Sequence, residues 1–223
     1  MTDPIEAEPE TTLFTRDWDV PWHAHIVPLV LALFMAAVWW TSTDPAMSSW
    51  ALSWSSLQGH HYLPLVGHIF AHGGWLHLVL NETVLLVLSG PLISRLGTPP
   101  IAWLRYLYLF LGSGLSGALL FLLVHRGDTA SVLGASGAIF GLVAALARVN
   151  PVTGDAEPIK SPRTWLLIKF FLQNHLALAV LIIAMALFSG SLVGFAWEAH
   201  LGGLLFGFLA TPLYLNRRPV SGR

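Results

Sequence analysis

Six apolar runs, each close to the length that crosses a lipid bilayer, divide this chain. They occupy residues 25–41, 76–94, 101–124, 134–149, 165–188 and 197–215. A spanning helix needs about 20 mainly apolar residues, so the first and fourth runs are short. The fourth run is rich in Gly and Ala, which suits a helix enclosed by its neighbours. The sequence therefore predicts an all-α membrane protein, built as a bundle of six transmembrane helices in one domain.

The composition agrees with a membrane protein. Hydrophobic residues make up 55% of the chain and charged residues only 10%, whereas about a quarter of a soluble domain is charged. The net charge of −1 argues against a nucleic-acid-binding surface. The chain has no cysteine, which excludes disulfides, a thiolate nucleophile and thiolate metal ligands. We expect no cofactor, and the lipid bilayer as a partner.

The Lys and Arg residues predict the orientation of the bundle. Ten of them fall on the face that holds both termini, and only Arg126 falls on the opposite face. By the positive-inside rule, both termini are then cytoplasmic. We expect a short acidic cytoplasmic tail over 1–24, the six-span domain over 25–215 and a basic cytoplasmic tail over 216–223. Residues 1–24 lack the pattern of a signal peptide, which favours a bacterial inner (cell) membrane.

This topology places four polar residues close to the outer face of the membrane. The second, fourth and sixth spans begin at the outer face, and near these starts lie His77 and Asn81, Ser136, and His200. All four are expected at a similar shallow depth below the outer surface. Polar groups at membrane depth are costly, so a functional interpretation is the default.

These residue types fit peptide cleavage by a serine. Ser136 can act as the nucleophile and His200 as the general base. His77 and Asn81 are four residues apart on one helix face, where both can donate hydrogen bonds to an oxyanion. Glu198 lies two residues before His200 and points elsewhere on a helix, so a Ser–His dyad is favoured over a triad.

Small residues allow the two spans to approach closely. Gly203 and Gly207 follow His200 on one narrow stripe of the sixth span. Gly137 and Gly141 form a small-xxx-small pair on the fourth span. These glycines predict a tight contact beside the proposed dyad. Phe140, one turn after the serine, is expected to form an aromatic floor under the site.

Three motifs carry a resemblance to a known family. They are HIFAHGGWLHLVLN at 68–81, GASG at 134–137, and WEAHLGG at 197–203 followed by Gly207. Together, in this order and on these spans, they resemble the rhomboid intramembrane serine proteases. The resemblance covers about residues 25–215. One departure is Phe140, which stands where many rhomboids have tyrosine.

The resemblance implies a rhomboid-like six-helix bundle with a water-filled cavity open to the outer side. By similarity, Ser136 is the nucleophile, His200 the general base, and His77 and Asn81 oxyanion ligands. Gly134 resembles the family glycine before the serine, where a larger side chain would crowd the cavity.

The implied substrates are single-pass or multi-pass membrane proteins, cleaved where a membrane helix unwinds near its outer end. The fifth span, from about Trp165, resembles the element past which such substrates enter.

Two other functions stay open. One is a non-catalytic rhomboid-like protein that binds or escorts membrane helices. The other is a transporter or metal-handling protein that uses the histidine-rich outer loop, although the spans show no two-half symmetry.

The remaining histidines receive no catalytic role from the sequence. Those of the outer loop are interpreted as polar packing rather than zinc ligands, because no Cys or carboxylate lies nearby; they are His60, His61, His68 and His72. Four further histidines are placed near span ends and receive no special role: His23, His25, His125 and His175.

Overall fold

The computed structural model describes residues 20–44, 47–151, 153–189 and 196–215. Within these residues, each predicted apolar run forms one helix. The helices are α1 (Ile26–Thr41), α4 (Trp75–Ile93), α5 (Ile101–Val124), α6 (Ser136–Ala147), α7 (Pro162–Ser189) and α8 (Trp197–Ala210). Most of the predicted acidic tail and the whole predicted basic tail, 216–223, lie outside the described residues.

Short elements connect these helices. They are η1 (Trp22–His25), η2 (Ser48–Trp50), β1 (Leu52–Ser53), α2 (Trp54–Gln58), α3 (Pro64–Gly67), β2 (Ser131–Val132) and η3 (Thr211–Leu213). β1 pairs antiparallel with β2, with Leu52 opposite Val132 and Ser53 opposite Ser131. This pairing ties the long connection between α1 and α4 to the segment that leads into α6.

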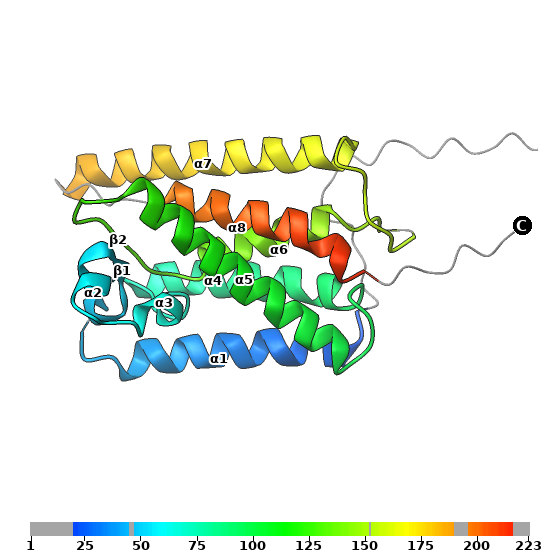
Figure 1. Cartoon of the computed structure of the whole chain (residues 1–223), viewed down its shortest axis with the longest axis horizontal. Helices are drawn as coiled ribbons and strands as arrows, with labels where there is room; N and C mark the ends of the chain where they lie inside the picture. Colours follow the sequence, from blue (N-terminus) through cyan, green and yellow to red (C-terminus); the bar gives the residue numbers. More distant parts are fainter. Residues whose placement is uncertain (1–19, 45–46, 152, 190–195, 216–223) are drawn as a thin grey trace, which may run out of the picture.

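Successive long helices run in alternating directions (Figure 1). The starts of α4, α6 and α8 therefore gather at the end of the bundle that carries β1 and β2, on the left of the figure. The start of α1 and the end of α8 lie at the opposite end. At the end that carries β1 and β2, a small apolar cluster buries Leu52, Val132 and Ala199.

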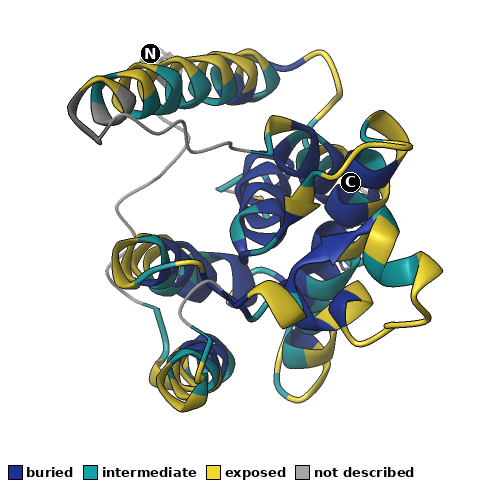
Figure 2. Cartoon of the chain, turned by 90° about the vertical axis from the view of Figure 1, so that its left-hand side faces the viewer, coloured by how far each residue is buried: buried dark blue, intermediate teal, exposed yellow. Residues whose placement is uncertain are grey.

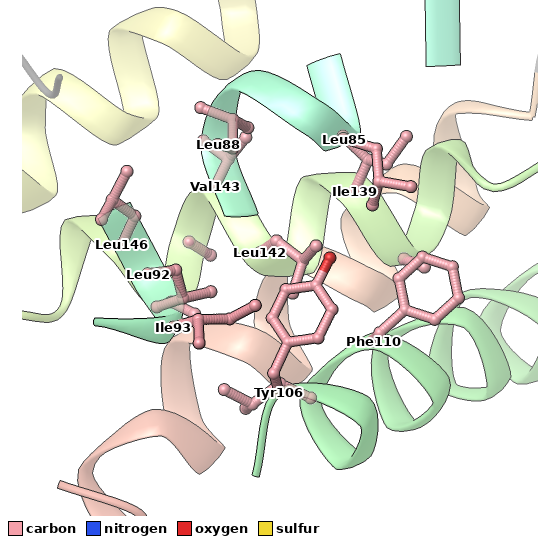
Figure 3. Packing of buried hydrophobic residues seen from close by; sticks show 14 of the residues in the cluster. Leu85, Leu88, Leu92, Ile93, Tyr106, Phe110, Ile139, Leu142, Val143 and Leu146 are labelled. Carbon is pink, nitrogen blue, oxygen red and sulfur yellow. The ribbon is translucent and has the colours of Figure 1, made fainter. Parts of the chain in front are cut away.

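The centre of the bundle is α6. All its residues from Gly137 to Ala147 are buried, and it packs among α4, α5, α7 and α8. The main hydrophobic core surrounds it with Leu85 and Leu92 of α4 and with Tyr106 and Phe110 of α5 (Figure 3). At 1.5 Å per residue, its 12 residues extend only about 18 Å. Such a short helix suits a place enclosed by neighbours, since a bilayer core is about 30 Å thick.

Four helical stretches among the described residues are long and apolar enough to cross a membrane. They are Trp22–Thr41, Trp75–Ile93, Ile101–Val124 and Pro162–Ala184. α6 and α8, with 12 and 14 residues, are shorter than this. The protein is thus a mostly helical bundle with four membrane-length helices, and the crossing of the bilayer by all six stays a prediction.

α7 stands at the edge of the bundle and exposes most of its surface (Figure 2). Only 6% of the residues in its apolar window are buried. Its exposed face carries Leu172, Leu176 and Val180, which suits contact with lipid tails. Its first turn is held to the bundle by Arg163, whose guanidinium donates to the carbonyl oxygens of Leu146 and Ala147.

Candidate active site

Ser136 and His200 meet between α6 and α8. Ser136 is the first residue of α6, and His200 lies in the first turn of α8. The Nε2 atom of His200 is 2.8 Å from Oγ of Ser136, which is the spacing of a nucleophile hydrogen-bonded to its base. The imidazole is buried, with an exposed fraction of 6%. Two residues 64 positions apart are therefore within proton-transfer distance.

Glycines make this approach of α6 and α8 possible. A Cβ added to Gly203 would overlap the carbonyl oxygen of Gly137, and one added to Gly207 would overlap that of Gly141. A Cβ on Gly137 would lie 3.0 Å from the carbonyl oxygen of Ala199, next to the base. The glycines singled out in the sequence thus form the helix contact that holds Ser136 beside His200.

Phe140 lies directly against the predicted base. Its ring stacks on the His200 imidazole, with centroids 4.5 Å apart and an interplanar angle of 28°. Phe140 is one turn below Ser136 on α6 and is buried. It therefore occupies the floor position that the helical spacing indicates.

His77 lies against the backbone just before Ser136. Gly134 adopts a φ of +115°, and a Cβ there would be 2.7 Å from Cε1 and 2.8 Å from Nε2 of His77. A glycine is required at this position both by the backbone conformation and by the imidazole. His77 thus packs against the turn that leads into Ser136.

Asn81 lies one turn below His77 on α4 and is buried. Its Nδ2 donates a hydrogen bond of 2.8 Å to the backbone oxygen of His77. A carboxamide has two N–H donors, so this bond orients the side chain and uses one of them.

Two loop histidines hold the turn that precedes α6. The backbone N–H of Gly134 donates to the carbonyl oxygen of His68 at 2.8 Å. The N–H of Ala135 donates to Nε2 of His72 at 3.4 Å. Burial, with a smaller contribution from His77, lowers the pKa of His72 to about 3. His72 is therefore neutral near pH 7 and can accept this bond. No group of three or more His, Cys, Asp or Glu residues suited to a metal ion occurs in the described part of the chain.

The expectation that His175 lies near a span end is wrong. It is at the midpoint of α7, and its Nε2 is 3.0 Å from Nδ1 of His200. Its own Nδ1 is 2.7 Å from the carbonyl oxygen of Phe171. The sequence did contain a signal, because a histidine inside a long apolar run is costly unless it has a partner.

Glu198 occupies the first turn of α8 and is buried, as expected for a helix-start residue. Its Oε1 lies 3.3 Å from Nε2 of His125. Asp128 contacts the other ring nitrogen of His125 at 2.7 Å. The two carboxylates thus contact His125, a different histidine from the one that contacts Ser136.

Comparisons with known proteins agree with this architecture. The family model described as the Rhomboid domain matches residues 59–217. The chain is similar to RHOMBOID-like protein 5 of Arabidopsis thaliana, with 29% identity over 225 aligned positions that cover 85% of this chain and 67% of that protein. It is also similar to Rhomboid-like protease 5 of Toxoplasma gondii, with 32% identity over 152 positions that cover 65% of this chain and 15% of that protein. Since the family match covers most of the chain and includes all three motifs, the chain belongs to the rhomboid family.

Proposed function

We propose that this chain is an intramembrane serine endopeptidase that cleaves membrane proteins with a dyad of Ser136 and His200. The observation that carries this proposal is the 2.8 Å contact between Oγ of Ser136 and Nε2 of His200. Membership of the rhomboid family supports it. The presence of both residues, correctly spaced, favours a protease over a non-catalytic relative.

The chemistry follows from this contact. As Oγ of Ser136 attacks the substrate carbonyl carbon, Nε2 of His200 accepts the hydroxyl proton. The tetrahedral intermediate then collapses, the C–N bond breaks, and His200 gives the proton to the leaving amine. Water then attacks the acyl-enzyme while His200 accepts its proton. The bond between the acyl carbon and Oγ breaks, and His200 returns the proton to Oγ, which regenerates Ser136.

The oxyanion has three sources of stabilisation. Ser136 begins α6, where the first backbone N–H groups have no intrahelical acceptor and the helix dipole is positive. The side chains of His77 and Asn81 are the other proposed donors. One such donor typically stabilises the transition state by ~3 kcal/mol.

The location of the site supports membrane proteins as the substrates. The starts of α4, α6 and α8 share one end of the bundle (Figure 1), and the predicted orientation puts this end at the outer leaflet. A peptide bond in an intact helix is shielded by its i→i−4 hydrogen bonds. The proposed substrates are therefore membrane proteins whose helix unwinds near its outer end.

The family and the apolar helices make this an integral membrane protein. The two similar proteins come from a plant and an apicomplexan parasite. They lend no support to a bacterial inner membrane, which stays a prediction from the sequence.

The test uses purified protein in liposomes with a transmembrane reporter. Wild type is compared with Ser136→Ala and His200→Ala, and reporter binding is measured alongside cleavage. We expect cleavage near the outer end of the reporter helix, lost in both variants and unaffected by EDTA. A fluorophosphonate probe should label wild type but not Ser136→Ala. Cleavage that persists in Ser136→Ala would overturn the proposal. Binding without cleavage in all three proteins would instead indicate a helix-binding relative.

A further inference from the structure

Each ring nitrogen of His200 contacts another side chain. Nε2 lies 2.8 Å from Oγ of Ser136, and Nδ1 lies 3.0 Å from Nε2 of His175. The first partner belongs to α6 and the second to α7. The imidazole of α8 thus bridges the two helices.

The contact between His175 and Phe171 indicates which nitrogen of His175 carries a proton. The carbonyl oxygen of Phe171 can only accept, so Nδ1 of His175, 2.7 Å away, must carry a proton. A neutral His175 then has a lone pair at Nε2. When both rings are neutral, Nδ1 of His200 donates to that lone pair, since two lone pairs would otherwise face each other.

This tautomer of His200 is the one that a general base needs. With its proton on Nδ1, His200 has a lone pair on Nε2, which faces the hydroxyl of Ser136. The opposite tautomer would put a proton on Nε2, where it could not accept the proton of the serine.

His175 is itself held firmly. Its ring centroid is 3.9 Å from that of Phe171 and 5.2 Å from that of Phe140. The bond to the Phe171 carbonyl oxygen fixes the χ angles of His175 through its own helix. A restrained side chain is what an orienting group requires.

We infer that His175 is a positioning residue of this site, which holds His200 in the tautomer and orientation that accept the serine proton. The inference rests on the proposed function. His175 would occupy the place that a carboxylate has in a Ser–His–Asp triad. Because it comes from α7, the site is complete only when this largely exposed helix lies against α6 and α8.

The expected effect is smaller than that of a triad carboxylate. Loss of the correct tautomer in a serine protease costs about 10⁴-fold in kcat, partly because the aspartate also stabilises the imidazolium. A neutral imidazole orients its partner but supplies no negative charge. We therefore expect a loss of about 10- to 100-fold in kcat.

The test compares His175→Phe with His175→Gln in the full chain. Phenylalanine keeps a ring of similar size but removes the acceptor, whereas glutamine offers an oxygen that can accept from Nδ1 of His200. His175→Phe should lower kcat and the rate of fluorophosphonate labelling of Ser136 in parallel, with KM changed by less than about 2-fold. His175→Gln should restore most of the loss. Leu176→Ala, the neighbouring residue with 67% exposure, is the matched control and should behave as wild type.

The nitrogen chemical shifts of His200, measured with ¹⁵N-labelled histidine, report the tautomer directly. We expect a protonated Nδ1 in wild type and a mixture of tautomers in His175→Phe.

If wild type cleaves and His175→Phe keeps both its kcat and its tautomer, the inference is overturned while the proposed function stands. Failure of glutamine to restore kcat in a folded protein would also overturn it. If wild type does not cleave, the proposed function fails, and the nitrogen shifts still test the contact. Should His175→Phe not fold, His175→Leu replaces it in the same comparison.

Discussion

The ring of Phe140 lies 4.5 Å from the imidazole of His200, nearly parallel to it at 28°. The same ring is 5.2 Å from His175 and 5.6 Å from Phe171. One side chain of α6 therefore supports both imidazoles of the site. The imidazole of His200, packed on one face and hydrogen-bonded at both nitrogens, has little freedom to leave this orientation.

Replacement of Phe140 should lower activity without unfolding the protein. Phe140→Leu keeps most of the buried volume but removes the stacking, which is worth about 0.5–1.5 kcal/mol. We expect kcat to fall roughly 2- to 10-fold. The control is Phe140→Tyr, which keeps the ring and should stay within about 2-fold of wild type. Steady-state cleavage of the reporter measures both, and an unchanged kcat in Phe140→Leu would show that stacking has no catalytic role.

Gly134→Ala should abolish most of the activity while the protein remains folded. The added Cβ would lie 2.7 Å from Cε1 of His77, so the imidazole must move away from the turn before Ser136. The φ of +115° adds backbone strain, which costs about 1–3 kcal/mol for a residue with a side chain. Reporter cleavage measures the loss of activity, and thermal unfolding in detergent measures the loss of stability caused by backbone strain.

Gly127→Ala is the matched control for this substitution. Gly127 also has a positive φ, +91°, but nothing lies within 4 Å of a Cβ built there. It should therefore lose a similar amount of stability and keep wild-type cleavage. Equal losses of activity in both variants would assign the effect to backbone strain rather than to His77.

The six long helices could be predicted because the length and hydropathy of each apolar run indicate a helix. The ends of three helices differ from the predicted bounds, and local features explain each difference. The run at 134–149 becomes a helix only at Ser136, because the left-handed φ of Gly134 interrupts the helix. α7 begins earlier than expected, at Pro162, since proline suits the first position of a helix. α8 ends at Ala210, and the chain continues through Pro212 as the short η3.

The proximity of Ser136 and His200 follows from counting spans, because alternating helices return every second start to the same end. Counting spans does not predict the contact between His175 and His200. The polar residues in the middle of α7 lie in different directions around the helix, so no single polar face indicates which side meets α8; they are Lys169, Gln173, Asn174 and His175. The rotation of α7 about its axis is set by the packing of side chains such as Phe171 against Phe140. Contacts of this kind between distant residues cannot be recognised from the sequence.

The cluster of His125, Asp128 and Glu198 should make stability depend on pH. The hydrogen bond to Asp128 raises the pKa of His125 above 6.5, and the same bond lowers the pKa of Asp128 below 3.8. A raised histidine pKa stabilises the fold below pH 6.5, and this effect disappears as the pH rises through the folded value. A lowered carboxyl pKa stabilises it above pH 3.8, and this effect disappears as the pH falls through the folded value.

Asp128→Asn should therefore lower Tm most between about pH 4 and pH 6.5. Asparagine keeps an Oδ1 atom to accept from the N–H of Ala130, which Asp128 contacts at 2.7 Å. The difference in Tm from wild type should shrink above pH 8 or so, where His125 is neutral. Thermal unfolding in detergent across this range measures it. A difference that grows with rising pH would contradict the assigned ion pair.

Single cysteines should reveal the orientation of the bundle, since the chain has none of its own. Thr129, between α5 and β2, and Thr98, between α4 and α5, are both exposed and lie in connections at opposite ends of the bundle (Figure 1). The positive-inside rule places Thr129 outside and Thr98 in the cytoplasm. In intact cells, a membrane-impermeant maleimide should label Thr129→Cys only, and permeabilised cells should show labelling of both. Labelling of Thr98→Cys alone would reverse the orientation and put the start of α6, with Ser136, on the cytoplasmic side.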